Sequence, residues 1–213
     1  MAQRKGEDYV ATRLRVPKKP LIILPRTLSD TTAPAYGRGA VGELDDDLTC
    51  KHSGEPVGER IVVTGRVIDG DGRPVRNSLV EIWQANTAGR YNHPGDDRSS
   101  QYLDEDISGF GRSGTDAGGE FSFLTVKPGP VPGPGGEVQA PHVMVSVFAR
   151  GLLKRLVTRV YFPDEEEANA VDPVLSSIED RDLRRTLIAR DEGGALRFDI
   201  HLQGDGQTAF FEF

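Results

Sequence analysis

The feature that most constrains the fold is a succession of short β-branched or alternating runs separated by turns rich in glycine and proline. A β-branched run covers residues 60–69, and a turn at residues 70–75 is expected to return the chain into a second run at residues 79–84. β-Branched residues favour strands because they pack well on a pleated surface, and glycine and proline favour turns. The same patterns predict strands at residues 21–24, 121–126, 144–149, 156–162 and 196–202.

One region departs from this pattern. Acidic residues at 164–167 suit a helix N-terminus, and a run at residues 180–190 places Leu183, Leu187 and Ile188 on one helical face. We therefore predict an all-β protein, a single β-sandwich of mainly antiparallel strands with a small helical excursion near residues 164–190. A chain of 213 residues suits one such domain, residues 1–213, with an N-terminal arm at about residues 1–24.

Charge and hydropathy exclude several classes of partner. The net charge of −7 argues against nucleic-acid binding, which needs a concentrated basic surface. The first 20 residues are basic, but they lack the apolar core of a signal peptide, and the chain has no run of 18 apolar residues that would predict a membrane span. The arm is expected to be either solvated or wrapped around a partner subunit. With Cys50 as its one cysteine the chain cannot form an internal disulfide, and we expect a cytoplasmic protein.

A proline-glycine hinge at residues 127–132 leads into an apolar strand at residues 140–148. His142 lies on that strand, and Met144 occupies the next position on the same face, because side chains alternate along a strand. Two histidines at this spacing would suggest a metal site, but methionine is a poor ligand for a hard metal. The residues alone leave open a metal site, a damaged metal site or an ordinary strand with one histidine.

The turns and strands alone resemble transthyretin-like and adhesin-type β-sandwich modules, which often only bind. Five further motifs are more specific: Trp83-Gln84-Ala85-Asn86, Gly89-Arg90-Tyr91, Phe110-Gly111-Arg112, Lys127-Pro128-Gly129 and Pro141-His142. With these motifs the chain, from about residue 8 to residue 213, resembles the intradiol ring-cleaving dioxygenases, and in particular the protocatechuate-cleaving members, which combine two homologous chains. This resemblance implies an oxidoreductase of aromatic catabolism that incorporates O2.

The resemblance also implies a ligand set. In this family one chain holds ferric iron through two tyrosines and two histidines, and these positions correspond here to Tyr91, Val131, His142 and Met144. A substrate-stabilising arginine of the iron chain corresponds to Gln139, and a glutamine near the iron corresponds to Arg159. Two surviving ligand positions, Tyr91 and His142, cannot recreate a site of four protein ligands. We therefore expect Fe(III) in the complex but not held tightly by this chain alone, and both residues have an alternative role in packing or hydrogen bonding.

The two halves of the chain resemble different partners of the heteromer. The C-terminal half is similar to the iron-free α chain, whereas residues before about 102 are similar to the iron-bearing β chain. The resemblance therefore implies a mosaic, and an ancestral-type sequence, a recombinant and a natural lineage all stay open as its origin.

In this family the iron-free chain lends an N-terminal loop and one arginine to the partner's pocket. The matching positions are Thr31, Ala33, Pro34 and Arg150. Arg150 would attract the carboxylate of protocatechuate, although a solvated surface arginine is the alternative. Ala33 stands where the family has glycine, so a loop that needs a positive φ would be strained there.

Three functional hypotheses follow. The first is an α-type subunit of a protocatechuate 3,4-cleaving complex that forms 3-carboxy-cis,cis-muconate. Its partner would be a homologous iron-bearing β-type chain or a further copy of this chain, and no catalytic residue is expected in this chain alone. The second is a self-sufficient ferric intradiol dioxygenase with altered ligands. The third is a non-catalytic β-sandwich binding module, because one fold hosts many functions.

Overall fold

A computed structural model describes residues 40–50, 53–133 and 135–212 of the chain. The chain divides into two compact units, Met1–Thr32 and Ala33–Phe213, and every described residue belongs to the second. The strand expected at residues 21–24 and the arm at about residues 1–24 lie outside the described residues. The assignment of residues 1–213 to one domain stays a prediction.

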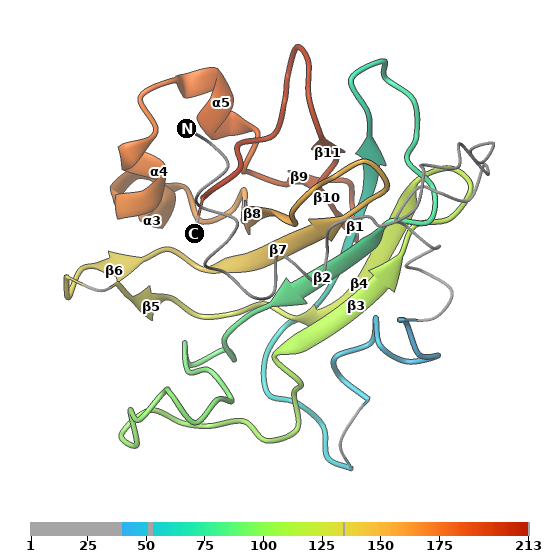
Figure 1. Ribbon diagram of the computed structural model, residues 1–213. Coiled ribbons are helices and arrows are strands. Elements are labelled where there is room, and N and C mark those ends of the chain that lie inside the picture. The colour runs from blue at the N-terminus through green and yellow to red at the C-terminus, as the bar shows by residue number, and fades with distance from the viewer. Residues whose placement is uncertain (1–39, 51–52, 134, 213) are drawn as a thin grey trace, which may run out of the picture. The chain divides into compact units, whose positions relative to one another are not determined.

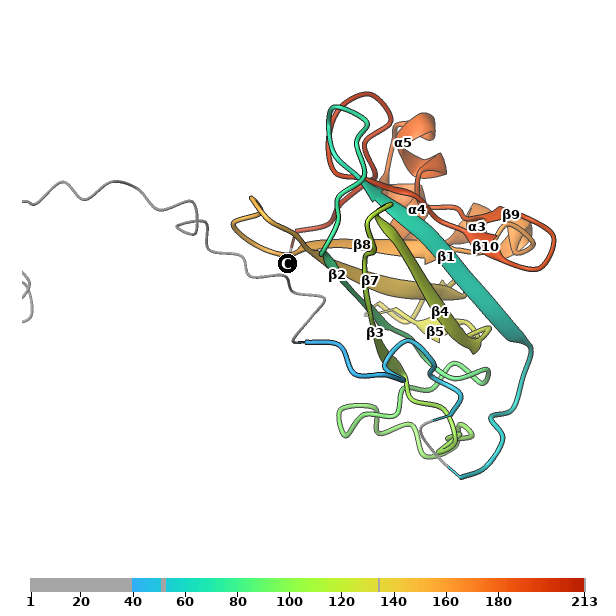
Figure 2. The ribbon, with the colours of Figure 1, turned by 90° about the vertical axis from the view of Figure 1, so that its right-hand side faces the viewer.

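Two β-sheets face each other in the second unit (Figures 1 and 2). The first sheet is built around β1 (Arg60–Ile68), which pairs antiparallel with β4 (Glu120–Val126) and parallel with β10 (Leu196–Arg197) and β11 (Ile200–His201), while β9 (Arg190–Asp191) extends it from β10. The second sheet is antiparallel, in the order β3 (Phe110–Gly114), β2 (Leu79–Trp83), β7 (His142–Phe148), β8 (Leu156–Tyr161). A small hairpin pairs β5 (Val131–Pro132) with β6 (Val138–Gln139). The predicted all-β fold of mainly antiparallel strands is confirmed.

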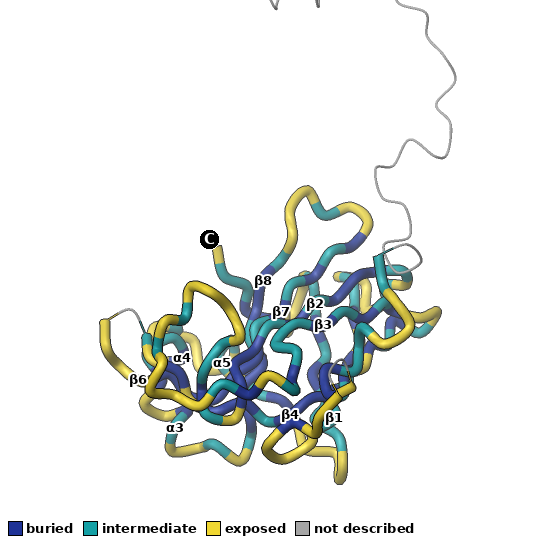
Figure 3. Tube along the Cα trace, turned by 90° about the horizontal axis from the view of Figure 1, so that it is seen from below, coloured by how far each residue is buried: buried dark blue, intermediate teal, exposed yellow. Residues whose placement is uncertain are grey.

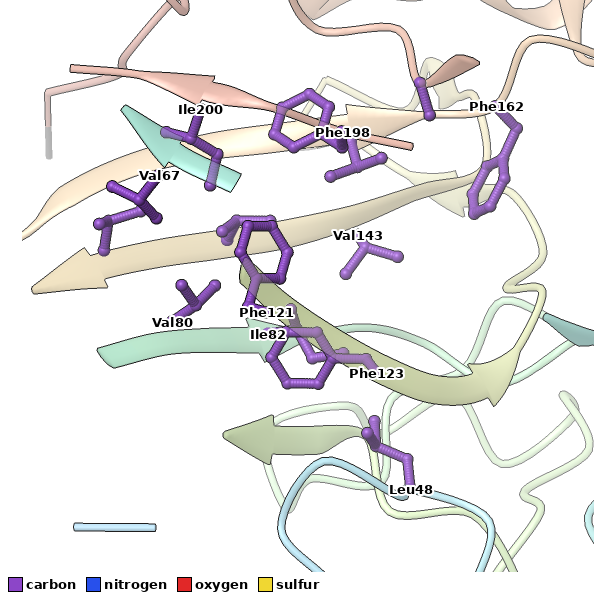
Figure 4. Packing of buried hydrophobic residues seen from close by; sticks show 14 of the residues in the cluster. Leu48, Val67, Val80, Ile82, Phe121, Phe123, Val143, Phe162, Phe198 and Ile200 are labelled. Atoms are coloured by element: carbon purple, nitrogen blue, oxygen red, sulfur yellow. The ribbon is translucent and has the colours of Figure 1, made fainter. Parts of the chain in front are cut away.

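The core lies between the inner faces of the two sheets (Figure 4). Ile82 and Val143 of the second sheet pack with Phe121 and Phe123 of the first. Each of these side chains is at most 5% exposed, and burial of a side chain of this size contributes roughly 1.5–3 kcal/mol. The inner face is therefore mainly apolar, although it includes Thr158 of β8, whereas His142 and Arg159 lie on the outer face.

The connection between β1 and β2 differs from the expected return. The turn brings the chain back only as far as Val75, whose N–H donates to the carbonyl of Val67 at 2.8 Å. The backbone then passes through Asn77, at a positive φ of 57° that asparagine tolerates better than most residues, and crosses to the other sheet. Turn chemistry specifies a local reversal, but it does not specify which sheet the next strand joins.

Three short helices occupy the predicted excursion: α3 (Glu166–Val171), α4 (Pro173–Ser177) and α5 (Arg181–Arg185). Together with β8 they enclose a second apolar cluster that includes Tyr161, Leu175 and Leu187. Figure 3 shows buried trace in the strands and more exposed trace over the helices and loops.

Two element boundaries were predicted wrongly. The helix expected over residues 180–190 ends at Arg185, because Leu187 and Ala189 instead exchange backbone hydrogen bonds with Tyr161 of β8. The strand expected over residues 196–202 is interrupted between β10 and β11, where the Phe198 N–H donates to the Thr64 carbonyl at 2.7 Å. Both segments are shaped by tertiary pairing, which overrides local propensity.

Candidate functional site

The outer face of the second sheet carries the predicted site on strands β2, β7 and β8. Trp83, Met144 and Arg159 are direct cross-strand partners, so they form one row on one face. His142 and Tyr161 are partners in the next row of the same face, because each lies two residues from a member of the first row. The ladder therefore brings two predicted ligand positions, His142 and Met144, beside Arg159.

His142 is one of the two positions that keep the residue type of the implied ligand set. Its side chain is buried, and Nδ1 lies 2.8 Å from the carbonyl oxygen of Ala140. A carbonyl only accepts hydrogen bonds, so Nδ1 carries the proton and the lone pair is left on Nε2. Burial, with a smaller contribution from the Arg159 charge, lowers the pKa of His142 to about 4. The neutral imidazole that ligates metals is therefore the form present near neutral pH.

Tyr91 follows β2 and is held by an aromatic stack. Its ring lies parallel to that of Trp83, with an interplanar angle of 4° and a centroid distance of 5.8 Å. Its backbone N–H donates to Asp96 at 2.8 Å, and a hydrogen bond from Arg98 holds the pKa of the Asp96 carboxyl well below its usual range. Burial raises the pKa of the Tyr91 hydroxyl, although the charge of Arg159 opposes that shift. The raised pKa favours the neutral phenol over the tyrosinate that a ferric ion prefers.

A pocket of about 380 Å³ opens beside Tyr91. Its walls combine aromatic rings with charged side chains, namely Trp83, Tyr91, His93, Asp96, Asp97 and Arg98, together with Gly95 and Pro132. His93 lies edge-on to Trp83, with a centroid distance of 6.0 Å.

Val131 and Gln139 face each other in the β5–β6 hairpin as register partners. Both are buried, and the Gln139 Oε1 accepts a hydrogen bond from Arg159 Nη1 at 2.6 Å. The position where the resemblance implies a second tyrosine, Val131, therefore holds an apolar side chain beside the residue that binds Arg159.

Arg159 connects this face to the helical excursion. Its Nη1 also donates to the Tyr161 hydroxyl at 3.2 Å, and that hydroxyl donates to Asp172 Oδ1 at 3.1 Å. The guanidinium carbon lies 5.9 Å from the ring centroid of Phe211. Burial raises the pKa of Tyr161, so its hydroxyl stays protonated and can donate.

Sequence reasoning missed the part that Tyr161 and Asp172 play. Tyr161 lies two residues after Arg159 on a predicted strand, so the shared face was readable. Asp172 precedes Pro173, which is a helix N-terminus signal, and its side chain accepts from the backbone N–H groups of Val174 and Leu175. No local pattern, however, indicates that Asp172 contacts Tyr161.

These residues do not fit ferric iron. Val131 offers no donor atom, Met144 offers a soft thioether, and Arg159 contributes a permanent positive charge. Within the described parts of the chain, no three His, Cys, Asp or Glu side chains cluster in a way that could hold a metal ion. The ligand roles of Tyr91 and His142 stay predictions.

The other predicted site residues lie elsewhere. Thr31, Ala33 and Pro34 are outside the described residues. Arg150 is exposed in the connection that follows β7, whereas His142 begins that strand. At about 3.4 Å per residue, β7 separates the two by roughly 20 Å. Arg150 therefore lies beyond the end of β7 opposite to His142, and its contribution to a partner's pocket stays a prediction.

Comparisons with known proteins identify the family. A family profile described as Dioxygenase matches residues 31–204. The chain is 45% identical to the protocatechuate 3,4-dioxygenase beta chain of Burkholderia cepacia, over 94% of this chain and 89% of that one. It is 41% identical to the alpha chain from Pseudomonas putida, over 91% of this chain and 100% of that one.

A solved structure agrees with this fold. The dioxygenase domain of a carbohydrate-binding fusion protein from Streptomyces sp. SirexAA-E aligns with 81% of this chain and 96% of that domain, at a TM-score of 0.51 and 24% identity.

None of the helices in the described ranges has the length and apolar character needed to cross a membrane. The chain belongs to the iron-dependent intradiol dioxygenases, as a subunit of such an enzyme.

Proposed function

We propose that this chain is the α-type subunit of a protocatechuate 3,4-dioxygenase-like complex. The complex would cleave the ring of protocatechuate between its two hydroxyl-bearing carbons, and both atoms of O2 would enter the product, 3-carboxy-cis,cis-muconate. The ferric iron would be held by a homologous β-type chain, where it would activate the bound catechol. The single observation that carries the assignment is the Arg159 guanidinium, which is anchored to Gln139 beside the ligand positions Val131, His142 and Met144.

The similarity to two different chain types supports a homologous partner. The identities of 45% to a beta chain and 41% to an alpha chain are close, so identity alone favours neither type strongly. The donor set favours the α type, because an iron-bearing chain needs anionic oxygen and imidazole ligands where this chain has valine and methionine. In this assignment the chain contributes a scaffold and the Arg150 cation, which would attract the substrate carboxylate.

A second candidate is a self-sufficient ferric dioxygenase with altered ligands, acting through self-association. The 45% identity to a beta chain favours it. This candidate requires stoichiometric iron and a tyrosinate charge-transfer colour in the purified chain. Membership in an enzyme family argues against the third hypothesis, a non-catalytic binding module.

One experiment separates the two candidates. The chain is purified alone and after co-expression with an iron-bearing β-type chain, and complex formation is checked by size-exclusion chromatography. Iron content and oxygen uptake with protocatechuate are then measured for both samples. We expect a colourless, inactive chain alone and an active complex. Stoichiometric iron with activity in the chain alone would overturn the proposal, and so would a stable complex that takes up no more oxygen than the β-type chain by itself.

A further inference from the structure

We propose that Arg159 replaces the metal cation in this chain, and that its guanidinium weakens the binding of ferric iron even when the missing ligand side chains are supplied. The inference rests on the proposed function only in placing the iron in a partner chain. It states that weak iron binding has two causes: the absence of two ligands and the positive charge of Arg159.

The first argument is the position of Arg159 relative to the four ligand positions. Arg159 is the cross-strand partner of Met144. His142 lies two residues before Met144, on the same face of β7. Its Nη1 binds Gln139, the register partner of Val131, and its charge acts on the hydroxyl of Tyr91. The Arg159 cation thus contacts, or acts electrostatically on, the segments that carry all four implied ligand positions.

The second argument is that Arg159 cannot easily move aside. Nη1 is shared between Gln139 Oε1 at 2.6 Å and the Tyr161 hydroxyl at 3.2 Å, and the guanidinium lies against the Phe211 ring. Tyr161 is itself held by Asp172, which is fully buried. The Arg159 Nε is buried too, without a partner in the described part of the chain. A guanidinium fixed in this way keeps its charge on the site, whereas a solvated arginine would swing into water.

The third argument is electrostatic. The guanidinium is a cation, so a metal ion that approaches this site meets a positive charge. Repulsion between this charge and a trivalent ion is strong inside a protein, because the effective dielectric constant is well below that of water. The glutamine that the resemblance implies at this position in the iron chain is neutral and would not oppose the metal.

The test compares three variants of the full chain. Val131→Tyr/Met144→His supplies the two missing ligand types. A second variant adds Arg159→Gln, which removes the charge while the introduced amide keeps a donor for Gln139. A third adds Arg159→Lys, which retains the charge and serves as the matched control. Each variant is titrated with ferric iron in the presence of a weak chelator. Bound iron and the tyrosinate charge-transfer absorbance are recorded.

We expect the Arg159→Gln triple variant to bind iron about 10- to 100-fold more tightly than the double variant, with the Arg159→Lys triple variant no tighter than the double. Equal affinity in the double variant and the Arg159→Gln triple variant would overturn the proposal. Absence of measurable binding in all three would do so as well, because Arg159 would not be the barrier.

Folding is checked for each variant by near-ultraviolet circular dichroism and thermal unfolding. If the Arg159→Gln triple variant does not fold, Arg159→Met takes its place, since it also removes the charge while keeping an extended side chain. Iron binding by this chain is measured without a partner and without oxygen uptake. Failure of this proposal is therefore distinguishable from failure of the α-type assignment, which depends on activity of the complex.

Discussion

Met144 and Arg159 lie directly opposite each other on β7 and β8, and the Arg159 guanidinium is tied to Gln139 Oε1 at 2.6 Å. An uncharged thioether therefore lies beside a permanent cation on the outer face of the second sheet. A ferric site requires the reverse, with anionic or neutral hard donors and no competing charge. In the proposal made above, this cross-strand pair opposes iron binding by the chain.

The Asp172 side chain is expected to contribute more to stability than an ordinary helix cap. Asp172 accepts hydrogen bonds from two backbone N–H groups of α4, from the Ala140 N–H at 2.8 Å and from the Tyr161 hydroxyl. Asp172→Ala should lower the free energy of unfolding by about 2–4 kcal/mol, because it removes a cap and leaves buried donors unpaired. Urea unfolding measures the change.

Asp180→Ala is the matched control for that measurement, because Asp180 also accepts from two backbone N–H groups but is exposed. Its expected cost is about 1 kcal/mol. Equal costs for the two variants would mean that the bonds of Asp172 to Ala140 and Tyr161 contribute nothing.

Stability is expected to fall below about pH 6.5 because of His142. Burial and the nearby Arg159 charge lower its pKa to about 4 in the folded chain, whereas the unfolded chain binds a proton near pH 6.5. Between these values the unfolded state binds more protons, so acidification favours unfolding, by roughly 3 kcal/mol over the whole interval. Urea unfolding from pH 4 to pH 7 in the wild type and in His142→Gln checks this. A pH dependence of equal size in the variant would contradict the assignment to His142.

Tyr91→Phe tests the ligand hypothesis directly. The introduced ring keeps the stack on Trp83 but has no hydroxyl. If the iron sits in the partner chain, oxygen uptake by the complex should change by no more than about twofold. If Tyr91 ligates catalytic iron, activity and the charge-transfer absorbance should both drop by about 100-fold or more. Bound iron is measured on the same samples.

Arg150→Ala tests the proposed contribution to the partner's pocket. Loss of a charge-assisted contact to the substrate carboxylate should raise the KM of the complex for protocatechuate about 10-fold or more, with a smaller effect on kcat. Catechol lacks the carboxylate, so its KM should not change. Arg155→Ala, exposed in the same connection, is the control variant. An equal KM increase for both substrates, or for both variants, would remove Arg150 from the pocket.

The strand content was readable from the sequence because its signals are local. Alternation and β-branching predicted the strands at residues 60–69, 79–84 and 121–126, and turn residues separated them. The period of two along β7 likewise predicted that His142 and Met144 share one face. β3 was not predicted, because its sequence, Phe-Gly-Arg-Ser-Gly, lacks β-branched residues and is paired only through its neighbour β2.

The sequence by itself determined that the chain forms short, mainly antiparallel strands, because residue identity and near-neighbour spacing are local signals. That its ligand positions hold only half of an iron-binding set is implied by the family resemblance and stays a prediction. Only the tertiary structure decided that β1 and β2 join different sheets, and that Gln139, Arg159, Tyr161 and Asp172 form one connected group. These contacts join β6, β8 and the start of α4, so they depend on sheet register and packing, which no local pattern encodes.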